Sequence, residues 1–124
     1  MDIKIKIIRS IDYLTVTDDG IVEFEESKNR LHEIAGVKSP PADFDILLDF
    51  RRTQWVLSTE EIFSLSSVLI DDPDSHRDKI ALLVLPGVNF EKAHFTELCS
   101  TRKQIDVKVF TNYEDAIHWF YNDF

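Results

Sequence analysis

Two apolar stretches, Phe44–Phe50 (FDILLDF) and Ile80–Leu85 (IALLVL), decide the fold of this chain. Nearly continuous apolar runs of this length are typical of strands that are covered on both faces of a parallel sheet. We therefore predict that the two stretches are adjacent central strands and hold the most buried side chains in the protein.

The chain before the first stretch predicts two further strands. Ile3, Ile5 and Ile7 alternate with Lys4 and Lys6, the period of a half-exposed strand whose lysines protect a sheet edge. Residues 13–17 (YLTVT) are rich in β-branched and aromatic side chains. The connection between them, residues 10–12, is short enough for a hairpin, so the first strand is expected to be antiparallel.

Helical periodicity fills the connections between the strands. We predict helices over residues 24–35, 59–70 and 90–102, a strand over 105–109 and a final helix whose apolar stripe includes Tyr113 and Phe120. Ser58 with Glu61, and Thr111 with Glu114, have the spacing of capping boxes. The predicted fold is one α/β domain over residues 1–124. It has a mostly parallel sheet of about five strands in sequence order, an antiparallel first strand and about four helices.

Composition limits the function classes. The 124 residues carry a net charge of −9, which disfavours nucleic acid and anionic lipid surfaces as partners. No apolar run is long enough for a membrane span or has the form of a signal peptide. Cys99 is the single cysteine, so disulfides are excluded and a reducing, cytoplasmic location is expected.

Three segments together resemble the SpoIIAA-like family: LLDF before a helix that opens at STEE, the strand IALLVL, and the closing VKVFTNYEDAIHWF. This family is related to STAS domains and, more remotely, to the CRAL-TRIO lipid-transfer fold. The resemblance implies an α/β sandwich in a small, cytoplasmic, often bacterial protein, and most members have no assigned activity. STAS anti-anti-sigma proteins carry a phosphorylatable serine in an Asp-Ser-Ser-Gly segment. That segment is absent here, so the phosphorylation switch does not carry over.

The loop after the first central strand is the candidate site. It combines two arginines, an aromatic side chain and a helix N-terminus at the edge where open α/β sheets bind ligands. The candidate residues for binding an anion or a partner are Arg51, Arg52, Thr53, Trp55, Ser58 and Thr59. The structural alternative is that an arginine pairs with Asp49, Trp55 packs on the sheet and Ser58 only caps the helix.

No pattern predicts catalysis, a metal or a cofactor. The acidic segment 71–78 lacks the glycine and glutamate of a calcium-binding loop, and the four histidines show no metal-ligand spacing. Cys99 shares an apolar helix face with Phe95 and Leu98, so a buried thiol is expected rather than a nucleophile. The nucleophile elbow of serine hydrolases, the Walker loop and the dinucleotide-binding glycines are all absent.

These observations favour a non-catalytic binding or regulatory module. It would act by protein–protein contact, tuned by an anion or a phosphate near a helix N-terminus. The alternative is a carrier for a small apolar ligand or a lipid, and an enzyme ranks last. The final helix, about 15 Å long, is too short to cover the whole second face of the apolar sheet. Either the hydrophobic loop over residues 55–57 or a second copy of the chain, in a symmetric homodimer, is expected to cover the remainder.

Overall fold

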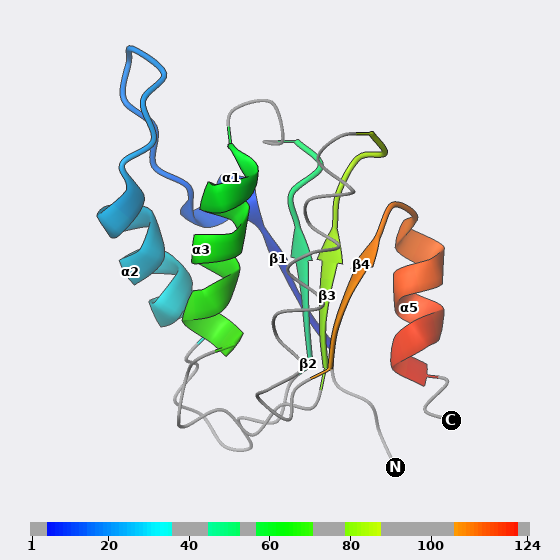
Figure 1. Ribbon diagram of the computed structural model, residues 1–124. Coiled ribbons are helices and arrows are strands. Elements are labelled where there is room, and N and C mark those ends of the chain that lie inside the picture. The colour runs from blue at the N-terminus through cyan, green and yellow to red at the C-terminus, as the bar shows by residue number, and fades with distance from the viewer. Residues whose placement is uncertain (1–4, 36–44, 53–56, 71–78, 88–105, 122–124) are drawn as a thin grey trace.

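The computed structural model describes residues 5–35, 45–52, 57–70, 79–87 and 106–121 (Figure 1). Their secondary structure alternates between strands and helices, as expected for the α/β class. In chain order the elements are β1 (Ile5–Arg9), α1 (Ser10–Tyr13), α2 (Phe24–Ala35), β2 (Asp45–Asp49), α3 (Thr59–Ile70), β3 (Lys79–Leu83), β4 (Asp106–Phe110) and α5 (Tyr113–Tyr121).

The strands form one four-stranded sheet in the order β1-β2-β3-β4, and every neighbouring pair is parallel. The two apolar stretches are its central strands, with Leu47 of β2 in register with Ile7 of β1 and Ala81 of β3. Residues 46–48 and 80–84 are all completely buried. The predicted central pair is therefore confirmed. Its second strand is shorter than predicted: β3 ends at Leu83, and Leu85, which the prediction included among the most buried side chains, is 43% exposed.

The predicted strand over residues 13–17 and the antiparallel first strand are wrong. The chain leaves β1 directly into the short helix α1, and Ser10 and Tyr13 are both buried there. Because β1 then connects to β2 through helices rather than through a hairpin, it runs parallel to β2. Within the described residues the sheet has four strands instead of about five, and β1 lies at its edge as expected.

The β-branched residues after α1 pair with each other instead of joining the sheet. Val16 forms an isolated antiparallel bridge with Val22, and the Thr17 amide donates to the Ile21 carbonyl at 2.8 Å. Gly20 closes this turn with a φ of 82°, a conformation that glycine adopts without steric cost. Figure 1 shows the resulting loop projecting beyond the end of the sheet.

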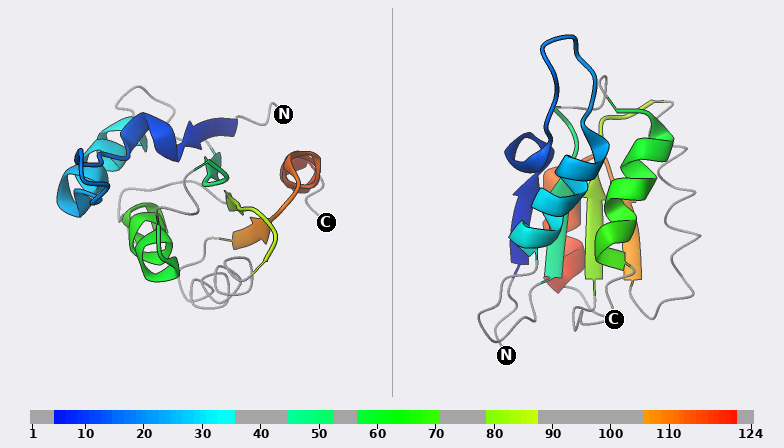
Figure 2. Two further views of the ribbon diagram at one scale, coloured as in Figure 1. Left: turned by 90° about the horizontal axis from the view of Figure 1, so that it is seen from above. Right: turned by 90° about the vertical axis from the view of Figure 1, so that its left-hand side faces the viewer.

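Helices cover both faces of the sheet (Figure 2). α2 and α3 lie on one face, because two crossovers of the same hand that advance in one direction place their helices together. Their buried stripes, which include Leu31 and Leu65, pack with Ile8, Leu48 and Leu82 of the sheet. α5 follows the last strand and folds back over the other face.

The centre of the second face is covered within one chain. Leu47, Ala81 and Leu83 are completely buried there and pack with Ala116 and Phe120 of α5. The homodimer was predicted because one short helix was expected to leave much of this face open. α5 covers the central positions, so the homodimer stays a prediction without this support. In the loop predicted as the other cover, residues 55–56 lie outside the described residues, and Leu57 packs in the cluster on the α2 and α3 side.

Two strand lysines stabilise helix C-termini at the amino edge of the sheet. The Lys6 ammonium donates to the Ile34 carbonyl near the end of α2, and the Lys79 ammonium donates to the Trp119 carbonyl of α5 at 2.9 Å. Helices that run antiparallel to the strands bring their negative dipole ends to this edge. The positive ends of α3 and α5 accordingly lie at the carboxyl edge, next to the predicted site (Figure 1).

Most element boundaries match the sequence prediction. The helices over 24–35 and 59–70 are confirmed, and the last strand is shifted by one residue. The cap of α5 is corrected: the Asn112 side chain, not Thr111, accepts hydrogen bonds from the amides of Glu114 and Asp115. The predicted helix over 90–102, with Cys99, and the start of the first strand lie outside the described residues.

Candidate functional site

Asp49 and Arg51 form the structural centre of the candidate site. Asp49 is the last residue of β2 and lies on the same face of the strand as Leu47, toward α5. Its Oδ1 accepts from Nε and from the backbone N–H of Arg51, both at 3.0 Å, and its Oδ2 accepts from Nη2 at 2.9 Å. The expected alternative, an arginine paired with Asp49, is therefore what the structure shows for Arg51.

Asp49 and Arg51 each favour the charged form of the other. Burial by itself would raise the pKa of Asp49, but the hydrogen bonds from Arg51 and the positive charges of Arg51 and Arg9 lower the pKa overall. The hydrogen bond with Asp49 raises the pKa of Arg51, burial opposes this, and the charge of Asp49 and the nearby Tyr113 add to it. The carboxylate and the guanidinium are thus both ionised at neutral pH, and Arg51 is held in one orientation.

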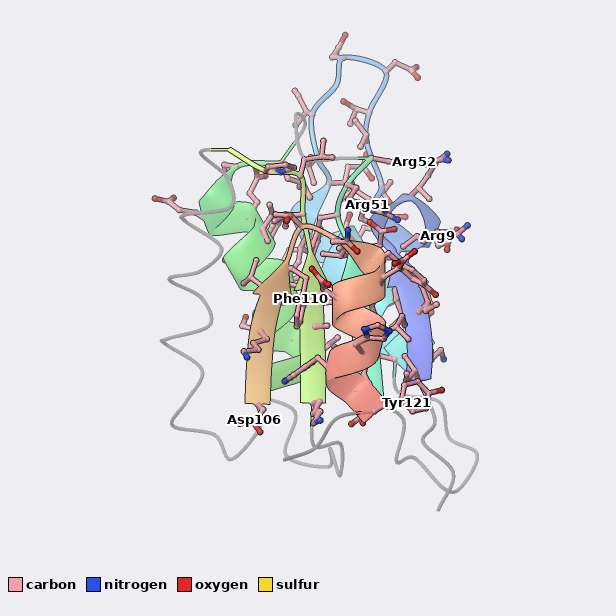
Figure 3. The ribbon with its side chains drawn as sticks, turned by 90° about the vertical axis from the view of Figure 1, so that its right-hand side faces the viewer. Arg9, Arg51, Arg52, Asp106, Phe110 and Tyr121 are labelled. Carbon is pink, nitrogen blue, oxygen red and sulfur yellow. The ribbon has the colours of Figure 1, made fainter. Side chains whose placement is uncertain are left out.

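Arg9 is the site residue that the sequence analysis missed. It is the last residue of β1 and is in register with Asp49, so the parallel pairing of two strands brings it beside the Asp49–Arg51 pair. Arg9 and Arg52 are exposed, and Figure 3 shows them with Arg51 at the carboxyl edge of the sheet. Its position at the end of a strand with alternating side chains could have pointed to Arg9. The predicted hairpin made β1 antiparallel, however, and an antiparallel first strand would not have placed Arg9 beside Asp49.

Ser58 acts as a helix cap. Its Oγ accepts from the Glu61 amide at 3.2 Å, and the Glu61 carboxylate accepts from the Ser58 amide at 2.9 Å. This confirms the predicted capping box. Glu60 and Glu61 place two carboxylates in the first turn of α3, which disfavours a second anion there. Thr59 is the first residue of that helix.

The structure brings together only part of the predicted set. Arg51 and Arg52 lie with Arg9 at the carboxyl edge of the sheet (Figure 3), whereas within the described chain no hydrogen bond or ion pair joins Ser58 to Arg51. Thr53 and Trp55 lie outside the described residues, so their assignment to the site stays a prediction. The acidic segment 71–78 and the His94–Cys99 spacing also lie outside them.

The described residues contain no group of three or more histidine, cysteine, aspartate or glutamate side chains that could hold a metal ion. In the same part of the chain, no helix has both the length and the apolar character needed to cross a bilayer. What the described residues do bring to one edge of the sheet is the Asp49–Arg51 ion pair and the exposed Arg9 and Arg52. Guanidinium groups can bind a carboxylate or a phosphate group of another molecule.

Comparison with known proteins adds no relative: no family model, no curated protein and no solved structure matches this chain.

Proposed function

We propose that this protein is a non-catalytic binding module that recognises an anionic group of a partner protein through Arg9, Arg51 and Arg52. One observation carries the proposal. At the carboxyl edge of the sheet, Asp49 holds Arg51 in a fixed orientation beside the exposed Arg9, in a chain whose net charge is −9.

The geometry leaves part of the Arg51 guanidinium available. Asp49 occupies Nε and one hydrogen of Nη2, while a guanidinium carries five N–H donors. The Arg51 side chain is 39% exposed, compared with 11% for Asp49. An incoming anion therefore meets the outer edge of a preoriented guanidinium. Less side-chain freedom is lost on binding than with a mobile arginine.

The negative charge of the rest of the protein restricts an acidic partner to the arginines of the site. A chain with 23 acidic and 14 basic side chains repels an acidic partner over much of its surface. The arginines at this edge then determine where such a partner docks. Binding, rather than catalysis, is also the function class that the resemblance to the SpoIIAA-like and STAS-related families implies, and a cytoplasmic location is part of the same proposal.

From the sequence, the anion was expected over residues 51–59, at Arg51 and Arg52 together with the N-terminus of α3. The Ser58 hydroxyl already caps that helix, and two glutamates occupy its first turn. We therefore keep Arg51 and Arg52 in the proposed site, add Arg9 and leave out Ser58 and Thr59.

The test is a titration of the ¹⁵N-labelled protein with inorganic phosphate at constant ionic strength, followed by NMR. We expect shifts at the amides of Arg9, Arg51 and Arg52 and at the Arg51 Nε. The double variant Arg9→Gln/Arg52→Gln keeps Arg51 but removes two of the three guanidinium groups, so it should weaken phosphate binding and raise the phosphate concentration needed for half-maximal shifts. Lys108→Gln removes an exposed cation from the opposite edge strand and should leave the titration unchanged. A titration curve that is the same in the double variant and the parent protein, or no shifts in the parent protein, would refute the proposal.

A further inference from the structure

An exposed isoleucine lies beside the arginines on the same face of β1. Ile8 packs into the core on the α2 and α3 side, and Lys6 reaches the end of α2, so Ile5, Ile7 and Arg9 lie on the α5 side of the strand. Ile7 is 41% exposed, although Leu47, its register partner in β2, is 0% exposed. The edge strand therefore keeps an apolar side chain accessible next to Arg9.

Tyr113 is a second exposed apolar residue at this end of the sheet. It is the first residue of α5, is 40% exposed and contributes to the raised pKa of Arg51. Figure 3 shows the arginines at the end of the sheet toward which β1 runs, with α5 beside them.

We propose that this surface binds an extended segment of a partner protein that carries a carboxylate and, two residues away, an aliphatic side chain. The carboxylate contacts Arg9 and Arg51, and the aliphatic side chain packs on Ile7. This inference rests on the proposed function, because the arginines supply the anchor, and it adds the class of ligand.

The spacing follows from strand geometry. Residues i and i+2 of any extended chain point to the same side and lie about 6.6 Å apart. Ile7 and Arg9 are themselves such a pair, so an extended segment lying along β1 presents its own i and i+2 side chains at the same interval.

The charge of the protein argues for an acidic protein segment rather than a membrane. A net charge of −9 opposes approach to an anionic lipid surface, whereas a single carboxylate on a short segment needs only the local arginines. The exposed Ile7 favours a peptide segment over a free anion, because only the segment has a neighbouring side chain that can bury the apolar area of Ile7.

The experiment compares three blocked peptides by NMR titration of the full chain: acetyl-Gly-Asp-Gly-Leu-Gly-amide, the same peptide with Gly in place of Leu, and the same peptide with Asn in place of Asp. We expect the Asp/Leu peptide to bind about fivefold more tightly than the Asp/Gly peptide, the effect of partly burying one leucine. The Asn/Leu peptide should bind at least tenfold more weakly than the Asp/Leu peptide, because it lacks the charge.

Matched variants separate the two contacts. Ile7→Thr keeps a β-branched side chain suited to a strand and should remove the fivefold advantage of leucine while leaving the Asp/Gly peptide unaffected. Arg9→Gln should weaken both aspartate peptides. Ile11→Ser changes an isoleucine of α1 that is 58% exposed and should change neither.

The outcomes distinguish this inference from the proposed function. Equal affinities for the Asp/Leu and Asp/Gly peptides, both weakened in Arg9→Gln, would overturn the apolar contact and leave the anion site standing. A leucine advantage that persists in Ile7→Thr would also overturn it. An Asn/Leu peptide that binds as tightly as the Asp/Leu peptide would overturn both proposals, because the arginines would then play no part.

Discussion

The carboxylate of Asp49 accepts three hydrogen bonds from Arg51: two from the guanidinium, at 3.0 and 2.9 Å, and one from the backbone amide, at 3.0 Å. One side chain therefore both ends the central strand β2 and orients the arginine of the candidate site. The turn and the binding surface depend on the same group, which makes Asp49 the most informative residue to change.

Replacing Asp49 by Asn keeps the size of the side chain and removes its charge. We expect the free energy of unfolding to fall by about 1 kcal/mol, the low end for a charged hydrogen-bonded pair because Arg51 is partly exposed. Phosphate binding should also weaken, because Arg51 is no longer held. Urea unfolding at pH 7 measures the first effect. Asp106→Asn, at an exposed position of β4, is the control and should change stability little.

The lowered pKa of Asp49 predicts how its contribution depends on pH. A carboxylate whose pKa is depressed in the folded state stabilises the protein above its unfolded pKa, about 3.9 for aspartate. This contribution is lost as the pH falls through the folded pKa. The stability difference between the parent protein and Asp49→Asn should therefore be constant from pH 7 to about pH 5 and shrink below about pH 4. A difference that grows on acidification would contradict the assignment.

Ser58 begins α3 through its capping box, so Ser58→Ala should cost about 1 kcal/mol of unfolding free energy. Ser58→Asn supplies another good cap and should restore most of the loss. Thermal or urea denaturation of the three proteins decides the point. An unchanged midpoint in Ser58→Ala would mean that another residue caps the helix.

Tyr13 carries a hydroxyl that is completely buried and, in the described structure, has no hydrogen-bond partner. Burial alone raises the pKa of this hydroxyl. Because a buried hydroxyl without a partner costs desolvation energy, Tyr13→Phe should stabilise the protein by about 1 kcal/mol. Tyr121→Phe, at an exposed position, should leave stability unchanged. A loss of stability in Tyr13→Phe would show that the hydroxyl is hydrogen-bonded in solution.

The homodimer is tested by light scattering at micromolar concentration. A second copy would have to bury surface other than Leu47, Ala81 and Leu83, which α5 already covers. A mass of two chains would support the dimer and would indicate that its interface includes the exposed apolar residues. A mass of one chain that does not change with concentration would contradict it.

Local sequence patterns were sufficient to predict the central strands, two of the helices and one helix cap. The runs FDILLDF and IALLVL predicted the central strands, because continuous apolar side chains have to be covered on both faces. The helical stripes over 24–35 and 59–70, and the capping box at Ser58, involve residues three or four apart, so a short window contains all of the interacting groups.

The direction of β1 and the place of Arg9 in the site depend on tertiary structure. Thr15–Thr17 can pair in a sheet or in a local loop with equal propensity. The burial of Ser10 and Tyr13 in α1 settled the choice, by turning the chain away from the sheet after β1. That turn made β1 parallel and aligned Arg9 with Asp49, across 40 residues of chain. Strand register is set by packing between segments far apart in sequence, so no local pattern could show that Arg9 belongs beside Arg51.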